Sequence, residues 1–258
     1  MLESIAYGMM LLSSAASGGY LTRAPDIGSG VQNAGSCSAV IGRGGNLNVG
    51  KQVLLGKCEG NGQPVKVETG QAGGKTLSFS VKKGRVSKKD RAELAAVQSR
   101  LNFNKDEFVG FEILIPKNSD ITNSWFYMVQ FWQGANHSPI AGLRMSRGYS
   151  HRAQLMFRGE GDPKGTTATT INFEPGRWTK IGLALNFNPR GNSCMTIYME
   201  GKSPYRKCGQ AGYTGKGVKP WYRLKFGIYK GSEPDKSFNV KFRNIKTGTS
   251  LKEIWPVS

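Results

Sequence analysis

The stretch Trp221-Tyr222-Arg223-Leu224-Lys225-Phe226-Gly227-Ile228-Tyr229-Lys230 alternates between apolar and polar side chains. Because every second side chain of a β-strand points to the same face, this alternation predicts a strand with two unlike faces. Gly227 has no side chain, so it leaves room for another group to approach the backbone between Lys225 and Tyr229. The polar face, which also carries Arg223, suits an acidic polymer. A half-exposed strand with solvated cations is the alternative interpretation.

Further short runs of this kind fill the chain from Thr76 onward, and Gly, Pro, Asn and Asp separate them. Besides 222–229, the predicted strands are 76–82, 108–115, 125–132, 140–146, 153–158, 167–173, 179–186, 195–199 and 238–245. Only 89–98 has the pattern of a helical turn or two. About ten strands without a long helix predict an all-β fold, an antiparallel β-sandwich or jelly roll.

The remaining N-terminal part gives weaker signals. Residues 18–70 are rich in Gly, Asn and Ser and predict about two strands, tied by a disulfide between Cys37 and Cys58. We find no internal repeat or linker, so we expect a single domain over 1–258. Residues 1–20 are either a signal remnant or an N-terminal extension of the fold, since the apolar run 5–16 follows Glu3 rather than a positive charge. No stretch is long enough to cross a bilayer.

The net charge of the chain limits the classes of partner that it can bind. The chain has 36 Lys plus Arg against 17 Asp plus Glu, a formal net charge of +19. Such an excess favours nucleic acid, an anionic membrane surface or an acidic polysaccharide. The sequence has no zinc-finger, helix-turn-helix or aromatic ribonucleoprotein signature. We therefore expect an anionic polysaccharide partner, no nucleic acid, no membrane, and a monomer.

The cysteines are Cys37, Cys58, Cys194 and Cys208, and their spacing matches no zinc site. Of three possible connectivities, two local disulfides, Cys37–Cys58 and Cys194–Cys208, are the simplest. They would indicate an oxidising compartment and a secreted or periplasmic protein, whereas buried free thiols are the alternative. We expect no metal and no cofactor.

Two further segments could carry chemistry. The basic run 82–94 is either a solvated loop or part of a polyanion site. The apolar run 125–133 contains Gln130, whose amide needs partners if it is buried, and Gln130 would share a face with Trp132. The two histidines, His137 and His151, flank the predicted strand 140–146. A lone histidine is more often structural than catalytic.

Three of these segments resemble, in order, the motifs of jelly-roll polysaccharide lyases. They are Arg91-Ala92-Glu93-Leu94, Gln130-Phe131-Trp132 and Tyr222-Arg223-Leu224-Lys225-Phe226-Gly227-Ile228-Tyr229. Alginate lyases have Arg-x-Glu-Leu, Gln-Ile-His and Tyr-Phe-Lys-Ala-Gly-Val-Tyr in these places, and heparin and glucuronan lyases have similar strands. The resemblance covers about 76–248. It implies a concanavalin A-like jelly roll and a lyase that cleaves uronate polymers by β-elimination.

The resemblance also implies site residues. Tyr229, Gln130, Arg91 and His137 are the expected catalytic residues, and Lys225, Arg223, Trp132, Glu93 and His151 the expected substrate-binding residues. The family's Gln-x-His histidine falls on Trp132, which cannot accept a proton. Either His137 or His151 takes over that role, or the role is dispensable, or catalysis is lost.

The chemistry of β-elimination explains why these residue types recur. The C5 proton of a uronate is weakly acidic, so the carboxylate must be neutralised before the proton leaves. An amide such as that of Gln130 and a guanidinium such as that of Arg91 suit this task. A phenol near cations, such as that of Tyr229, can serve as base, acid or both. Histidine is the better base when the two protons lie on opposite faces of the sugar.

Two other functions compete with this hypothesis. A non-catalytic, lectin-like module for an anionic glycan would explain Trp132 in place of histidine. A glycoside hydrolase on a related sandwich needs two carboxylates at a fixed separation, and the strand pattern Glu-x-Asp-x-x-Glu of such enzymes is absent.

Overall fold

The structure is a computed structural model, and it describes residues 47–48, 54–60, 65–69, 75–81, 91–96, 100–120, 125–134, 137–230 and 237–255. The expectations for residues 1–20 and for the Cys37–Cys58 pair lie outside these described residues and side chains. Among the described residues, no helix is long and apolar enough to cross a membrane.

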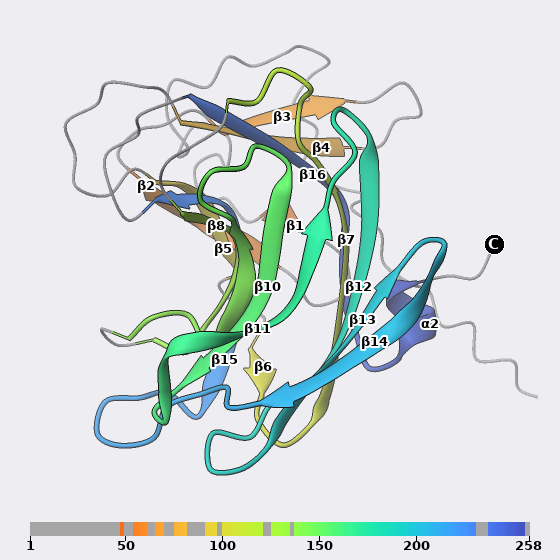
Figure 1. The fold of residues 1–258 in the computed structure, drawn as a ribbon. Coiled ribbons are helices and arrows are strands. Elements are labelled where there is room, and N and C mark those ends of the chain that lie inside the picture. Colours follow the sequence, from red (N-terminus) through yellow and green to blue (C-terminus); the bar gives the residue numbers. More distant parts are fainter. Residues whose placement is uncertain are drawn as a thin grey trace, which may run out of the picture.

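Two antiparallel sheets stack face to face (Figure 1). Sheet A has the order β1 (Leu47–Asn48), β2 (Leu54–Gly60), β5 (Arg91–Ala96), β15 (Trp221–Lys230), β8 (Phe126–Trp132), β9 (Ala141–Met145), β10 (Arg152–Gly159) and β11 (Asp162–Asn172), and β6 (Leu101–Asn102) pairs with β15. Sheet B has the order β14 (Lys202–Gly209), β13 (Ser193–Met199), β12 (Trp178–Asn186), β7 (Asp106–Leu114), β16 (Phe238–Gly248), β4 (Lys75–Val81) and β3 (Val65–Thr69). A short helix, α2 (Leu251–Ile254), follows β16.

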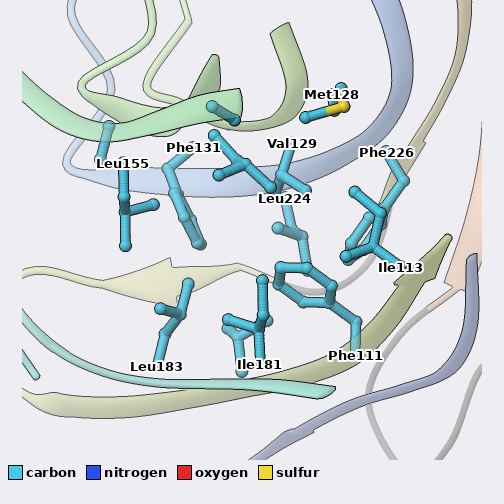
Figure 2. Packing of buried hydrophobic residues seen from close by; sticks show 14 of the residues in the cluster. Phe111, Ile113, Met128, Val129, Phe131, Leu155, Ile181, Leu183, Leu224 and Phe226 are labelled. Carbon is cyan, nitrogen blue, oxygen red and sulfur yellow. The ribbon is translucent and has the colours of Figure 1, made fainter. Parts of the chain in front are cut away.

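The core lies between the sheets. Figure 2 shows Phe111 of β7 and Ile181 of β12 on one side, facing Phe131 of β8 and Phe226 of β15 on the other. The rings of Phe111 and Phe226 meet edge to face, with centroids 5.5 Å apart. Each such fully buried apolar side chain contributes about 1.5–3 kcal/mol to folding, so this layer fixes which face of each strand points inward.

The antiparallel β-sandwich expected from the sequence is confirmed, and each of the ten predicted strands appears with ends shifted by a few residues. The helical turn predicted at 89–98 is wrong, because Arg91–Ala96 forms strand β5 between β2 and β15. Ala92 and Leu94 enter the core, while Glu93 points to the other face. Pairing on both edges therefore overrides the helix propensity of Ala, Glu and Leu.

Strand β11 begins at Asp162, five residues before the predicted strand 167–173. Strand β14 forms a hairpin with β13, and its residue range was not predicted because it is a largely exposed edge strand without an apolar alternation. The Cys194–Cys208 disulfide is confirmed, and it joins directly opposite residues of β13 and β14 with a Cα–Cα distance of 4.1 Å.

Candidate active site

The face of sheet A that points away from the core, here called the outer face, carries the polar residues of the central strands. Strands β15 and β8 are neighbours, and their register sets Arg223 opposite Trp132 and Lys225 opposite Gln130. Leu224 and Phe226, which alternate with the two cations, belong to the apolar core. The site residues expected on two segments that are distant in the sequence are therefore cross-strand neighbours.

A β-bulge in β8 adds Tyr127 to the outer face. Tyr127 pairs with Arg144 of β9, and Gln130 pairs with Gly142, two residues away from Arg144 on the same side of that strand. Tyr127 and Gln130 are three residues apart, so strict alternation would have turned the Tyr127 ring into the core. The extra residue at Met128 shifts the alternation by one position, so the Tyr127 ring points to the outer face instead.

Gly142 makes room for the Tyr127 ring. A Cβ atom at Gly142 would lie 2.9 Å from Cδ1 of Tyr127 and 2.5 Å from the Val129 carbonyl oxygen. A glycine is therefore needed here for the ring to lie across β9.

Tyr229 reaches the outer face beyond a second irregularity, in the pairing of β15 with β8. The register shifts between Phe226 and Tyr229, after which Tyr229 lies opposite Tyr127. Gly227 sits in this irregularity with a φ of +131°, in the region that favours glycine. A Cβ atom there would lie 2.8 Å from Cα of Glu93 and closer still to the Ala92 carbonyl oxygen. The room that Gly227 provides is thus filled by strand β5.

Gln130 has the partner that its burial requires. Its amide Nε2 donates a hydrogen bond to Oε1 of Glu93, and the two side chains are only 3% and 2% exposed. Glu93 comes from β5, directly opposite Gly227 and so diagonal to Lys225. The ammonium-bearing Lys225 is itself 4% exposed. A buried amide, carboxylate and ammonium thus gather at the centre of the outer face.

Trp132 occupies the place where the resemblance expects histidine, and its ring contacts two cations. Nζ of Lys225 lies 4.3 Å and Cζ of Arg223 4.5 Å from the ring centroid. Arg223 also lies 5.8 Å from the ring of Trp221, and Arg100 lies 5.0 Å from that ring. These contacts have the geometry of cation–π interactions, so Trp132 orients the positive charges of this face.

The two tyrosines of the outer face differ in exposure. Tyr127 is 2% exposed, and its hydroxyl donates to Sδ of Met156 at 3.4 Å. Burial raises the pKa of Tyr127, and the nearby Arg158 and Arg144 oppose that rise. Tyr229 is only half-buried. Tyr229 is thus the phenol that a ligand can reach.

The two histidines lie near opposite ends of β9. His137 is exposed and stacks on Tyr213, with ring centroids 4.4 Å apart. Tyr213 is fixed by Gln133 of the loop after β8, whose amide accepts from the Tyr213 backbone N–H at 2.7 Å. His151 has Nε2 2.9 Å from the Pro116 carbonyl and Nδ1 2.7 Å from Oγ of Ser150. Both ring nitrogens of His151 are thus at hydrogen-bond distance from groups of the fold.

Arg91 lies opposite Tyr229 in the register of β5 and β15, and its side chain lies outside the described residues.

Sequence reasoning missed Tyr127, although it lies in a strand that was singled out, because a bulge leaves no mark in the alternation. It also missed Arg144 and Arg158 of the neighbouring strands. Among the described residues, no group of three or more His, Cys, Asp or Glu side chains is placed to hold a metal ion.

Comparison with known proteins identifies the family. The profile of the family described as polysaccharide lyase matches residues 50–255. Among solved structures, an endo-β-1,4-glucuronan lyase from the fungus Trichoderma reesei aligns with a TM-score of 0.59 and 10% identity, over 78% of this chain and 93% of that one. A family 7 alginate lyase in complex with substrate aligns with a TM-score of 0.50 and 13% identity, over 71% of this chain and 81% of that one.

No curated protein matches the sequence. At these identities the structural likeness shows a shared fold, and the profile match over most of the chain shows the family. The chain belongs to the polysaccharide lyase family.

Proposed function

We propose that the protein cleaves a uronate-containing polysaccharide by β-elimination on the outer face of sheet A. The observation that carries the proposal is the position of Tyr229, a reachable phenol on the same face as the buried Gln130, Glu93 and Lys225. A net charge of +19 favours a polyanionic substrate over a neutral one.

In the proposed reaction, Gln130 and Arg91 neutralise the carboxylate of the sugar that loses its proton. Neutralisation stabilises the negative charge that develops as the C5 proton leaves. The Gln130 amide is held by Glu93 and so is oriented before the substrate arrives. Arg91 is opposite Tyr229 in the strand register, which suits a shared sugar.

Tyr229 moves both protons in this scheme. Its phenolate oxygen takes the proton from C5, the C4–O4 bond breaks, and the phenol then returns the proton to the leaving O4. The products are a sugar with a C4–C5 double bond and a new hydroxyl end, so atoms and charge balance without a further reactant. Lys225 and Arg223 place positive charge on the same face, where it would hold a neighbouring acidic group of the polymer.

The second candidate is a non-catalytic module that binds an anionic glycan. Trp132 favours it, because the lyase motif has a histidine at this place and the Trp132 ring holds cations instead. In that case the same face would bind the polymer without cleaving it.

A polymer panel separates the two functions. Purified protein is incubated with alginate, glucuronan, heparin-type and ulvan-type polymers, and ultraviolet absorbance of the unsaturated product is followed. We expect absorbance to rise with at least one polyuronate and to stay flat with the same polymer after chemical reduction of its carboxyl groups. Binding of a polyuronate without any rise in absorbance on the whole panel would favour the binding module.

A further inference from the structure

A depression of about 360 Å³ opens on the outer face where β8 begins, beside β9 and the start of β10. Its lining includes Arg144, Arg147 and Arg152, together with Trp125, Tyr149 and Gln154. The volume is within the range of about 300–1,000 Å³ in which proteins hold small ligands. No proposed catalytic residue lines it.

The charge of this depression is one-sided. Three guanidinium groups line it, and none of its lining residues is acidic. Their contacts are with neutral groups: Nη2 of Arg144 donates to Oε1 of Gln154 at 3.1 Å, and Cζ of Arg152 lies 4.6 Å from the centroid of the Tyr149 ring. Nε of Arg144 is buried without an acceptor among the described residues. No carboxylate in the lining neutralises these guanidinium groups, so they can pair with an anionic ligand.

Aromatic side chains form the rest of its rim. Trp125 is 41% and Tyr149 44% exposed, and they are two of the three large exposed apolar side chains in the described part of the protein. Exposed rings beside a pocket mark binding surfaces, because a ring combines a flat apolar face with a polar edge. An aromatic rim around an arginine cluster therefore fits a sugar that carries an acid group.

The depression adjoins the proposed catalytic phenol. The Trp125 ring contacts the Tyr229 ring edge to face, with centroids 6.5 Å apart, and contacts the Tyr127 ring at 5.8 Å. Arg144 lies opposite Tyr127 in the strand register. One polymer chain could therefore occupy both places at once.

We propose that this depression is a second anion subsite, which holds the acid group of a sugar unit beside the one that is cleaved. The acid group is a carboxylate or a sulfate ester, since both present anionic oxygens that pair with guanidinium. The inference rests on the proposed function and narrows its substrate to polymers with acid groups on neighbouring units.

The test compares two double variants. Arg147→Gln/Arg152→Gln removes two charges from the depression, and Arg206→Gln/Lys207→Gln removes two from exposed positions on β14 of sheet B. Each is made in a Tyr229→Phe background, so that binding is measured by calorimetry without turnover. We expect the first pair to raise the Kd for a uronate oligosaccharide roughly 10-fold, the loss of about one charge-assisted hydrogen bond. The control pair should change the Kd by less than about 2-fold. Equal Kd values for the two pairs would overturn the subsite.

Two probes identify the acid group. One oligosaccharide carries only carboxylates, and the other carries sulfate esters as well. A loss of affinity confined to the sulfated probe assigns the subsite to sulfate, and a loss with both assigns it to carboxylate.

A change with neither probe overturns the subsite even if the parent cleaves polyuronates. If the parent binds but cleaves none of the polymers, the catalytic proposal fails while the Kd comparison still decides the subsite. If the parent binds neither probe, both proposals fail.

Discussion

Tyr229 of β15 and Tyr127 of β8 lie directly opposite each other, immediately beyond the irregularity in the pairing of these strands. The ring of Trp125 contacts both of them. Tyr127 is buried, with its hydroxyl against Met156, whereas Tyr229 is only half-buried. Tyr127 therefore packs within the face, and Tyr229 is the phenol that a ligand can reach. Removal of each hydroxyl in turn therefore separates the two roles.

Tyr229→Phe should abolish turnover while sparing binding and stability. The change removes only the hydroxyl that moves the protons, and the ring still contacts Trp125. Proton-transfer groups contribute about 10²- to 10⁴-fold in rate, so kcat should fall by that factor on the polyuronate that the parent cleaves. Tyr205→Phe on β14, where the side chain is 47% exposed, is the matched control and should behave as the parent.

Tyr127→Phe completes the comparison. Its hydroxyl makes a weak hydrogen bond to the buried sulfur of Met156 on the outer face, so we expect kcat to fall less than about 10-fold. If Tyr229→Phe cleaves as fast as the parent, or if Tyr127→Phe shows the larger loss, Tyr229 is not the residue that transfers the proton.

His137→Ala tests whether a histidine has replaced the one missing at Trp132. The contact that the structure shows for His137 is its stacking on Tyr213. If Tyr229 carries both protons, kcat for this variant should stay within about 10-fold of the parent. A fall of about 100-fold or more, with unchanged thermal stability, would instead make His137 a second acid or base. His151→Ala should mainly lower stability, because it removes the contacts with Ser150 and Pro116.

Trp132→Phe and Trp132→Leu test the role of the ring. Phenylalanine keeps an aromatic face for the two cations, although a weaker one, and leucine keeps none. We expect the Leu variant to lose about 1–2 kcal/mol in the free energy of unfolding, measured by denaturant titration, and the Phe variant about half of that. Neither variant should change kcat more than about 10-fold. A 100-fold loss of kcat in a stable Phe variant would contradict the cation-holding role.

Much of this fold could be predicted because it depends on alternation that is visible in single strands. Leu224 and Phe226 face the core, and Arg223 and Lys225 face outward, as their spacing requires. Strand β5 could not be predicted, because its pairing with β2 and β15 outweighs the local preference of Arg91–Ala96. Strand formation at a buried position is decided by neighbours that are distant in the sequence.

The outer face could be predicted in part, because β15 keeps its alternation from Arg223 to Tyr229 although its pairing with β8 shifts after Phe226. Gln130, Lys225 and Tyr229 come together as the motifs imply, and Glu93 joins them through the Gln130 amide. Tyr127 was missed, since the extra residue at Met128 changes which side chains share a face. The close approach at Gly227 was expected, but the sequence does not show that the approaching group is the backbone of β5.

Tyr222→Phe should make the protein less sensitive to alkaline pH. Burial, and then the charge of Glu107, raise the pKa of Tyr222 well above its ordinary value of 10.0. The unfolded chain therefore loses this proton at a lower pH than the folded chain. The stability contributed by the neutral phenol is complete below the unfolded pKa and is lost as pH rises toward the folded one.

The measurement is the free energy of unfolding at about pH 8 and about pH 11. The decrease between them should be smaller in Tyr222→Phe than in the parent, and Tyr205→Phe should keep the parent's decrease. At the lower pH the Phe variant should be at least as stable as the parent, since the Tyr222 hydroxyl is buried without a hydrogen-bond partner among the described residues. An unchanged alkaline decrease would show that other groups cause it.

Gly227→Ala should destabilise the site through the backbone. At a φ of +131°, a Cβ atom would meet the Ala92 carbonyl and Cα of Glu93, so β15 and β5 must move apart. We expect a loss of about 3 kcal/mol in the free energy of unfolding, from the unfavourable φ and the overpacking together. Gly201→Ala is the matched control, because Gly201 also has a positive φ, +69°, but no atom lies within 4 Å of its added Cβ. That variant should lose only about 1 kcal/mol in the free energy of unfolding.

Equal losses in the two variants would mean that the approach of β5 is not what requires glycine at position 227. A larger loss at Gly227, together with a higher KM, would link this close approach to the position of Glu93 and Lys225 on the outer face.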